Sequence, residues 1–325
     1  MGRIVSNLIL GDGTNYVNAA HALQANDLNW EVVKRSLYAR IPHTWDKNGK
    51  ALTGTFKKAD NLYGILRADT LHTLGAVSRQ YNVIQNAEGF APLDTLVDEG
   101  GLQIIGAGSM DKGAQVWMQA QASNPLMIGG EAIATSIIAM MRHDGTGSLR
   151  FLPSFVRFFC TNQLRGLLNA ARKTKAEWAV PIRHASNSKQ RIEAARASLK
   201  LLVEAQVAFK RTAESLLATP FTATEMRKLA ETLIPKPEGP DATSRAMTMW
   251  DQRMTAMMKD AYYARDLDAI RPTAWGALNA VADFEQHHTR VTGDDQKRLE
   301  RLFIRSFQDG PMVRQAVAAL IPATR

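Results

Sequence analysis

The hydrophobic pattern of the chain changes near Pro181, and this change most constrains how the chain folds. Before it, short runs that mix apolar and polar residues are separated by turn-forming sequences such as Asp111-Lys112-Gly113, which is typical of antiparallel strands. After it, apolar residues recur every three to four positions, which is typical of helices. The sequence therefore predicts an α+β fold, in which an antiparallel β-rich core with packed helices, of the β-β-β-α type, is followed by a mainly helical half.

Turn and cap residues place the individual elements. The first half is expected to hold strands at about 30–39, 53–59, 63–68, 74–81, 102–107, 114–122, 132–142 and 149–159, with helices at about 86–98 and 161–173. Residues 53–59 and 63–68 are expected to pair around a turn at Asp60-Asn61. The second half is expected to hold helices at about 188–216, 222–234, 243–265, 273–288 and 294–319. We therefore divide the chain into an α+β domain, residues 1–183, and a helical domain, residues 184–325.

Positive charge is concentrated where these two halves meet. The chain has 40 Lys and Arg against 31 Asp and Glu, a net charge of +9. Residues 142–212 hold 14 basic and four acidic residues, so this segment carries +10 and the rest of the chain −1. Such a concentration is what a polyanion-binding surface requires, because contacts to phosphates release counterions. An ordinary solvated helix face is the alternative for residues 189–211.

The sequence lacks the motifs of the common enzyme and metal-binding classes. Cys160 is the single cysteine, so the chain forms no internal disulfide and no zinc site built from several cysteines. The seven histidines show no metal-ligand spacing, no Gly-Lys-Ser/Thr of a P-loop occurs, and the acidic residues are scattered. Apolar runs such as 132–141 are too short to span a bilayer, which takes about 20 residues. We therefore expect a cytoplasmic protein that is not an enzyme, with no cofactor, no metal and no membrane partner.

The candidate nucleic-acid-binding residues lie in the basic hairpin at 132–159 and just after it. They are Arg142, Arg150, Arg157, Arg165, Arg172, Lys173, Lys175 and Arg183. A secondary set comes from the first strands, where alternating positions often face solvent: Lys34, Arg35, Lys57, Lys58 and Arg79. Aromatic rings near the basic hairpin could stack on bases, but they occupy both faces of a strand, so most of them are expected in the core. These rings are Trp117, Phe155, Phe158 and Phe159.

Three stretches resemble the phage/plasmid-like protein family, a domain of unknown function. They are residues 74–86, residues 143–147 together with Cys160-Thr161-Asn162, and residues 273–281. The resemblance covers about residues 28–290 and implies carriage by phages and conjugative plasmids, without implying an activity. In architecture, a β-β-β-α core followed by a basic hairpin is similar to the phage single-strand annealing recombinases (the RecT, Redβ, Erf and Rad-type proteins). This similarity implies ATP-independent annealing by rings or filaments that hold single-stranded DNA in a positive groove.

These observations leave three hypotheses for the function. The first is an oligomeric protein, possibly a ring or filament, that binds single-stranded DNA and promotes its annealing without ATP. The second is a non-catalytic factor of a mobile element that binds a host protein or duplex DNA in counter-defence or regulation. The third is a metal-dependent nuclease, for which the sequence offers no cluster of acids.

Overall fold

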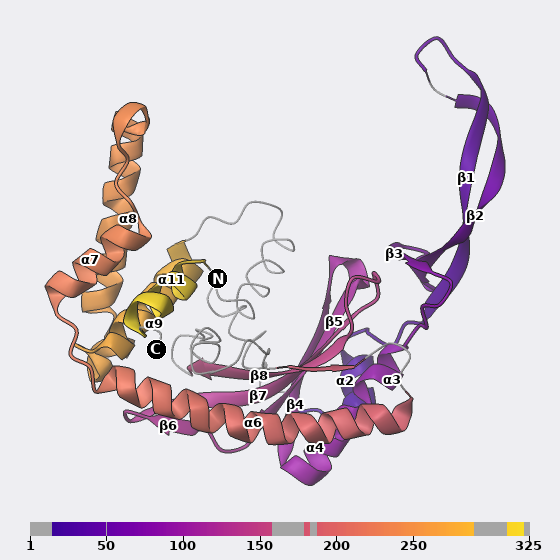
Figure 1. Ribbon diagram of the computed structural model, residues 1–325. Helices are drawn as coiled ribbons and strands as arrows, with labels where there is room; N and C mark the ends of the chain where they lie inside the picture. The colour runs from indigo at the N-terminus through magenta and orange to yellow at the C-terminus, as the bar shows by residue number, and fades with distance from the viewer. Residues whose placement is uncertain (1–14, 50, 158–178, 183–186, 289–310, 322–325) are drawn as a thin grey trace.

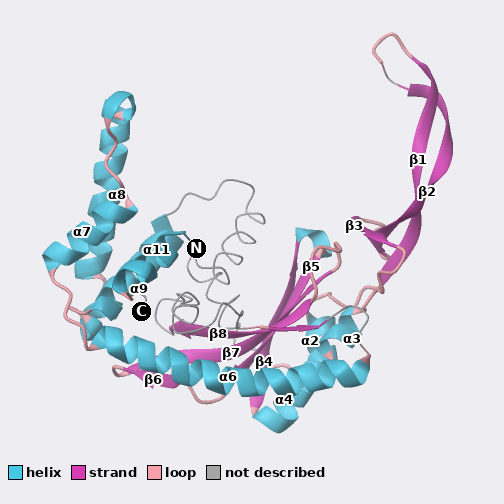
Figure 2. Cartoon of the chain, viewed as in Figure 1, coloured by secondary structure: helices cyan, strands magenta, loops and turns pink. Residues whose placement is uncertain are grey.

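The computed structural model describes residues 15–49, 51–157, 179–182, 187–288 and 311–321. Two antiparallel sheets precede a mostly helical half, so the expected α+β class is confirmed (Figure 1). The larger sheet and one long helix form the base of the molecule in this view. A two-stranded ribbon rises from one end of the base, and a pair of helices rises from the other end (Figure 2).

Nine strands form the two sheets in the described residues. The three-stranded sheet has the order β1-β2-β3, and the six-stranded sheet has the order β4-β5-β7-β8-β9, with β6 paired to β7. The strands are β1 (Val32–Trp45), β2 (Ala51–Arg67), β3 (Thr73–Ser78), β4 (Leu102–Met110), β5 (Gln115–Ala122), β6 (Leu126–Ile128), β7 (Glu131–Arg142), β8 (Leu149–Arg157) and β9 (Val180–Ile182).

The helices cover the larger sheet and then extend beyond it. They are α2 (Ala19–Ala25), α3 (Asn86–Phe90), α4 (Pro92–Gly100), α6 (Ser188–Leu217), α7 (Ala223–Leu233), α8 (Ser244–Tyr263), α9 (Ala274–His288) and α11 (Pro311–Leu320), with short 3-10 turns at Asp111–Gly113, Gly239–Asp241 and Arg265–Ile270. Asn187 begins α6 and Thr222 begins α7, each through a capping box with the residue three positions on.

Strands β1 and β2 form a long hairpin, and here one sequence prediction is wrong. The predicted turn at Asp60-Asn61 is not a turn, because β2 runs through it as one strand. Asn61 does adopt a left-handed φ of 57°. The register of β1 against β2 shifts at this point, where residues between Lys58 and Tyr63 lie opposite Leu37. The turn-forming pair therefore makes a bulge that bends the strand instead of reversing it.

Other predicted elements agree with the structure or need small corrections. The hairpins β4–β5 and β7–β8 are confirmed, as are the long helix α6 and the helices α7, α8 and α9. The helix predicted at 86–98 is divided at Ala91 into α3 and α4, because Pro92 begins a new helix. The short elements α2, β6 and β9 were not predicted. The helix predicted at 161–173 lies outside the described residues.

One continuous hydrophobic core joins the larger sheet to the helices. The ring of Phe155 on β8 stacks on Phe209 of α6 with centroids 4.5 Å apart. Phe209 in turn meets the fully buried Trp275 of α9 edge to face at 6.1 Å. These contacts cross the boundary that we draw at residue 183, and the division into two domains stays a prediction.

Candidate nucleic-acid interface

The structure describes only part of the primary set of predicted residues. Arg165, Arg172, Lys173, Lys175 and Arg183 lie outside the described residues, and the side chain of Arg157 at the end of β8 is also outside the description. Arg142 and Arg150 therefore represent the primary set below.

Arg142 and Arg150 lie on the same face of the larger sheet. Arg142 at the end of β7 pairs with Gln115, and Arg150 on β8 pairs with Met140, a residue on the same face of β7. Arg150 is exposed, whereas the Arg142 side chain is 38% exposed and forms a two-point ion pair with Asp144. Much of the charge of Arg142 is thus compensated within the protein by Asp144.

The ionisation of Asp144 makes the stability of the folded protein depend on pH. Burial by itself would raise the pKa of Asp144, but hydrogen bonds from Arg142 and Thr146 outweigh burial and lower it to about 2. As the pH falls, the Asp144 carboxylate takes up its proton at a higher pH in the unfolded chain than in the folded protein. The stabilisation of the folded state by ionised Asp144 is therefore fully present above about pH 4 and is lost as the pH falls toward 2. Because Arg142 is partly exposed and solvent screens the ion pair, we expect this stabilisation of the folded state to be about 1–2 kcal/mol.

This expectation is checked by urea unfolding of the wild type and of Asp144→Asn at about pH 6 and about pH 2.5. The wild type should lose about 1–2 kcal/mol more unfolding free energy on acidification than the variant does. Equal losses in the two proteins would contradict it.

The turn after β7, residues 143–147, contacts residues 75–86 and so holds the small sheet against the large one. We call this contact region the joint. Gly75 of β3 lies so close to Asp144 that a Cβ there would be 2.6 Å from its Cα. The Nε2–H of the buried His143 donates a hydrogen bond to Asn86 Oδ1 at 2.8 Å, and Gln85 makes a two-point contact with the backbone of Val32 at the start of β1. The stretches 74–86 and 143–147 quoted above thus meet in space, and their contacts are structural.

Tyr81 completes the joint as a hydrogen-bond donor. Its hydroxyl donates to the carbonyl oxygen of Arg142 at 3.4 Å. Burial, and secondly the negative charge of Asp144, raise the pKa of Tyr81 to about 12. The hydroxyl therefore keeps its proton at neutral pH, and the contact persists there.

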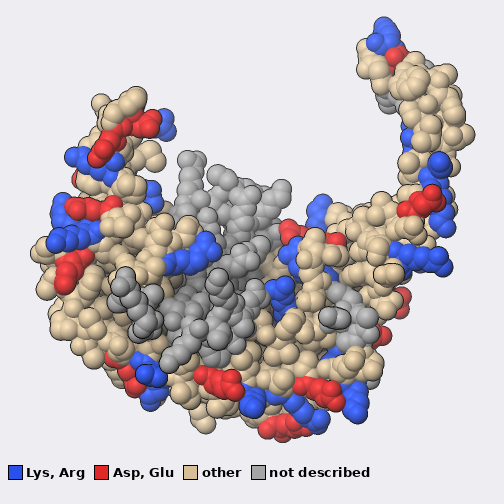
Figure 3. All heavy atoms as spheres, viewed as in Figure 1, with Lys and Arg blue, Asp and Glu red and all other residues tan. Residues whose placement is uncertain are grey.

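Beyond this joint, the hairpin of β1 and β2 extends away from the body, and we call residues 32–67 the arm (Figure 1). The arm contains eight Lys or Arg and only two acids, Asp46 and Asp60. Lys and Arg are seen at its tip and toward its base in Figure 3. This second concentration of positive charge is hidden when the arm is summed together with the acidic remainder of the chain, as in the charge count above.

The secondary set of predicted residues lies on the arm or beside it. Arg35, Lys57 and Lys58 are exposed along the arm, and Arg79 is exposed just after β3. Lys34 has a structural role instead. Its Nζ donates to the carbonyl oxygens of Arg79 and Tyr81 and lies 4.8 Å from the centroid of the Tyr63 ring.

The aromatic rings follow the same division between core and arm. Trp117 and Phe155 are buried at 3% and 2% exposure, so the expectation that they belong to the core is confirmed, while Phe158 and Phe159 lie outside the described residues. On the arm, Tyr38, Trp45 and Phe56 are exposed by 57% or more. Sequence reasoning missed these three. Their spacing within a strand pair that also carries Arg40, Lys57 and Lys58 was the available signal.

The two faces of the arm differ in character. Tyr38 lies directly opposite Lys58, and Arg40 lies directly opposite Phe56. Residues opposite each other in an antiparallel pair share a face, and so do residues two apart on one strand. One face therefore carries two rings and two cations in a diagonal arrangement. The other face carries Ala39 opposite Lys57 and Ile41 opposite Thr55, so these two pairs have one cation and no aromatic ring.

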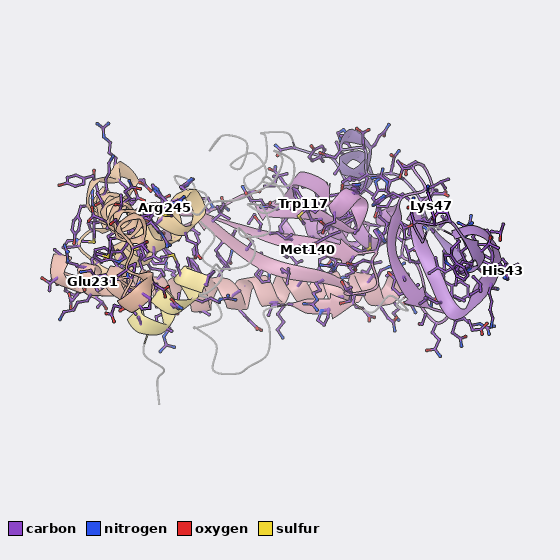
Figure 4. All side chains as sticks on the ribbon, turned by 90° about the horizontal axis from the view of Figure 1, so that it is seen from above. His43, Lys47, Trp117, Met140, Glu231 and Arg245 are labelled. Carbon is purple, nitrogen blue, oxygen red and sulfur yellow. The ribbon has the colours of Figure 1, made fainter. Side chains whose placement is uncertain are left out.

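At the opposite end of the molecule, α7, α8 and α9 carry mixed charges. Figure 4 looks down on the molecule and shows Glu231 and Arg245 at this end, Trp117 and Met140 on the sheet, and His43 and Lys47 on the arm. His288 of α9 contacts Asp260 of α8 at 3.0 Å, and His287 contacts Asp283 at 3.3 Å. Within the described residues, no three His, Cys, Asp or Glu side chains come together in a way that could hold a metal ion.

Comparison with known proteins gives one family. The model of a family described as a domain of unknown function (DUF932) matches residues 73–306. No curated protein and no solved structure matches the chain. Among the helices in the described part of the chain, none has the length and apolar character needed to cross a membrane.

Proposed function

Because the chain belongs to the DUF932 family, whose description states no activity, we propose a function from the surface of this protein itself: ATP-independent binding and annealing of single-stranded DNA. The proposal places the protein in the cytoplasm as an oligomeric recombination factor of a phage or plasmid. Its ligand contacts are to the sugar-phosphate backbone, and its chemistry requires no bond to be made or broken.

The observation that carries the proposal is the charge and exposure of the arm. Arg35, Lys57 and Lys58 extend into solvent on a ribbon that projects from the body, where phosphates can approach from several sides. An excess of six positive charges on residues 32–67 attracts a polyanion and neutralises its phosphates on contact. Arg150 extends the positive surface onto the larger sheet.

Annealing follows from binding of this kind when several copies act together. Two strands repel each other through their phosphates, and a protein surface that neutralises both strands lets their bases pair without a nucleotide cofactor. An assembly of many copies, as a ring or filament, would hold each strand over a longer distance. The arms of such an assembly would supply the positive surface at regular intervals.

The proposal is tested by fluorescence anisotropy with labelled single-stranded DNA, duplex DNA and RNA at two salt concentrations. We expect single-stranded DNA to bind tighter than duplex, with an affinity that falls with salt at a log–log slope of about −3 if about four phosphates are contacted. Gel filtration should show a large assembly, and complementary strands should anneal faster with the protein present. A monomer or dimer that binds duplex DNA or a host protein instead would favour the regulatory function over this one.

A further inference from the structure

We propose that the face of the arm bearing Tyr38, Arg40, Phe56 and Lys58 stacks unpaired nucleobases. The proposal rests on the proposed function for the presence of a nucleic acid, and it adds which chemical part of the strand this face binds. The arm then does more than attract phosphates, because its rings distinguish a strand with accessible bases from a duplex.

The exposure of the rings is the first observation. Tyr38 is 58% exposed and Phe56 is 70% exposed, although both lie at paired positions of β1 and β2. Single exposed apolar side chains are common on protein surfaces, but several large ones on one narrow ribbon mark an interaction site. Ile41, Trp45 and Leu62 of the same ribbon are also exposed, by 43% to 57%.

The arrangement of the rings is the second observation. Because Phe56 is two residues from the partner of Tyr38, the two rings are diagonal neighbours, whose Cα atoms lie about 7–8 Å apart in an antiparallel pair. Stacked nucleotides rise about 3.4 Å per base along a strand. The two ring-bearing positions are therefore spaced at about twice the stacking distance, which suits the insertion of one base between the rings.

The cations on the same face supply the contacts to the backbone. Arg40 lies opposite Phe56, and Lys58 lies opposite Tyr38, so each ring has a positive side chain beside it. A nucleotide whose base stacks on a ring thus places its phosphate within reach of a neighbouring cation.

This chemistry fits an unpaired strand better than the other polyanions. In a duplex the bases stack on each other and their faces are not available, so the rings of the arm would gain no contact. Stacking on aromatic side chains is tolerant of sequence, because every base has a π-face. We therefore expect little preference among sequences, which suits a protein that anneals any complementary pair.

The test compares oligothymidine with an abasic oligonucleotide of the same length, which keeps the phosphates and lacks the bases. The variant replaces both rings by leucine (Tyr38→Leu with Phe56→Leu), so apolar bulk is kept while the flat rings are lost. Tyr263→Leu is the matched control, because Tyr263 is 76% exposed at the end of α8, far from the arm in Figure 1. Circular dichroism confirms that each variant is folded.

We expect the wild type and Tyr263→Leu to bind oligothymidine at least about tenfold tighter than the abasic strand. The double leucine variant should bind oligothymidine about tenfold or more weaker than the wild type, and should bind the abasic strand as the wild type does. The ring-preserving changes Tyr38→Phe with Phe56→Tyr should restore the preference for bases.

Equal binding of the two oligonucleotides by the wild type would overturn the stacking proposal and leave the proposed function standing. Unchanged oligothymidine binding by the double leucine variant would also overturn the stacking proposal and leave the proposed function standing. No binding of either oligonucleotide would overturn both. A further measurement uses vesicles of phosphatidylserine and phosphatidylcholine. If the double leucine variant loses binding to these vesicles but keeps its binding to DNA, the partner of the rings is a membrane surface.

Discussion

Replacing Lys57 and Lys58 by glutamate is expected to weaken binding of single-stranded DNA on the order of a hundredfold at low salt. Both side chains are exposed on the arm, so the change reverses two charges without removing a buried contact. Losing two phosphate contacts should make the log–log salt slope shallower by about 1.4. Anisotropy titrations across a salt series measure the affinity and the slope together.

The matched control for this prediction is Lys228→Glu with Lys259→Glu. These two lysines are exposed on α7 and α8, at the opposite end of the molecule from the arm in Figure 1, and the control changes the net charge of the protein by the same amount. We expect the control to lower the affinity by only a few fold, through the overall field. If both double variants weaken binding equally, the arm is not the site and only the net charge of the protein matters.

Gly75→Ala is expected to lower the free energy of unfolding by about 3 kcal/mol. The new Cβ would stand 2.6 Å from the Cα of Asp144 and 2.7 Å from its carbonyl carbon. Backbone atoms in a tight turn cannot move aside as the end of a flexible side chain can. The small sheet must therefore shift relative to the larger sheet to make room for the new Cβ. Urea unfolding with an unchanged m-value would report this loss directly.

Gly106→Ala is the control for the Gly75 prediction. Gly106 is also in a strand, but a Cβ there would meet only the ring of Trp117 at 3.5 Å, an ordinary contact distance. We expect this change to alter the unfolding free energy by less than about 1 kcal/mol. An equal effect of the two alanine substitutions would show that the joint at Asp144 yields easily and does not fix the position of the arm.

Much of the fold could be predicted from local patterns, because turn and cap residues act through their immediate neighbours. Gly101 ends α4 in a left-handed conformation, and Thr222 caps α7, as their residue types indicate. The Asp60-Asn61 pair misled the prediction, since a left-handed Asn61 occurs in a bulge as readily as in a turn. The choice between the two depends on the long pairing with β1, which a local pattern does not contain.

The candidate site was harder to predict than the fold, because exposure depends on which faces the tertiary structure covers. Trp117 and Tyr38 both lie in strands of mixed polarity, yet Trp117 is buried on the larger sheet and Tyr38 is 58% exposed on the arm. Lys34 and Lys58 differ in the same way, because Lys34 is held by backbone carbonyls at the arm's base. Sequence alone identified the basic residues but not which of them meet solvent.

The irregular pairing of the arm has a consequence for how the protein behaves at high concentration. A strand of 14 residues at an open edge would ordinarily recruit strands from other molecules and lead to aggregation. In β1, register shifts at Leu37 and near His43 interrupt the ladder, and Pro42 has no N–H to offer. Like charges on neighbouring ribbons also repel each other. These irregularities therefore oppose edge-to-edge pairing of the long, solvated ribbon with strands of other molecules.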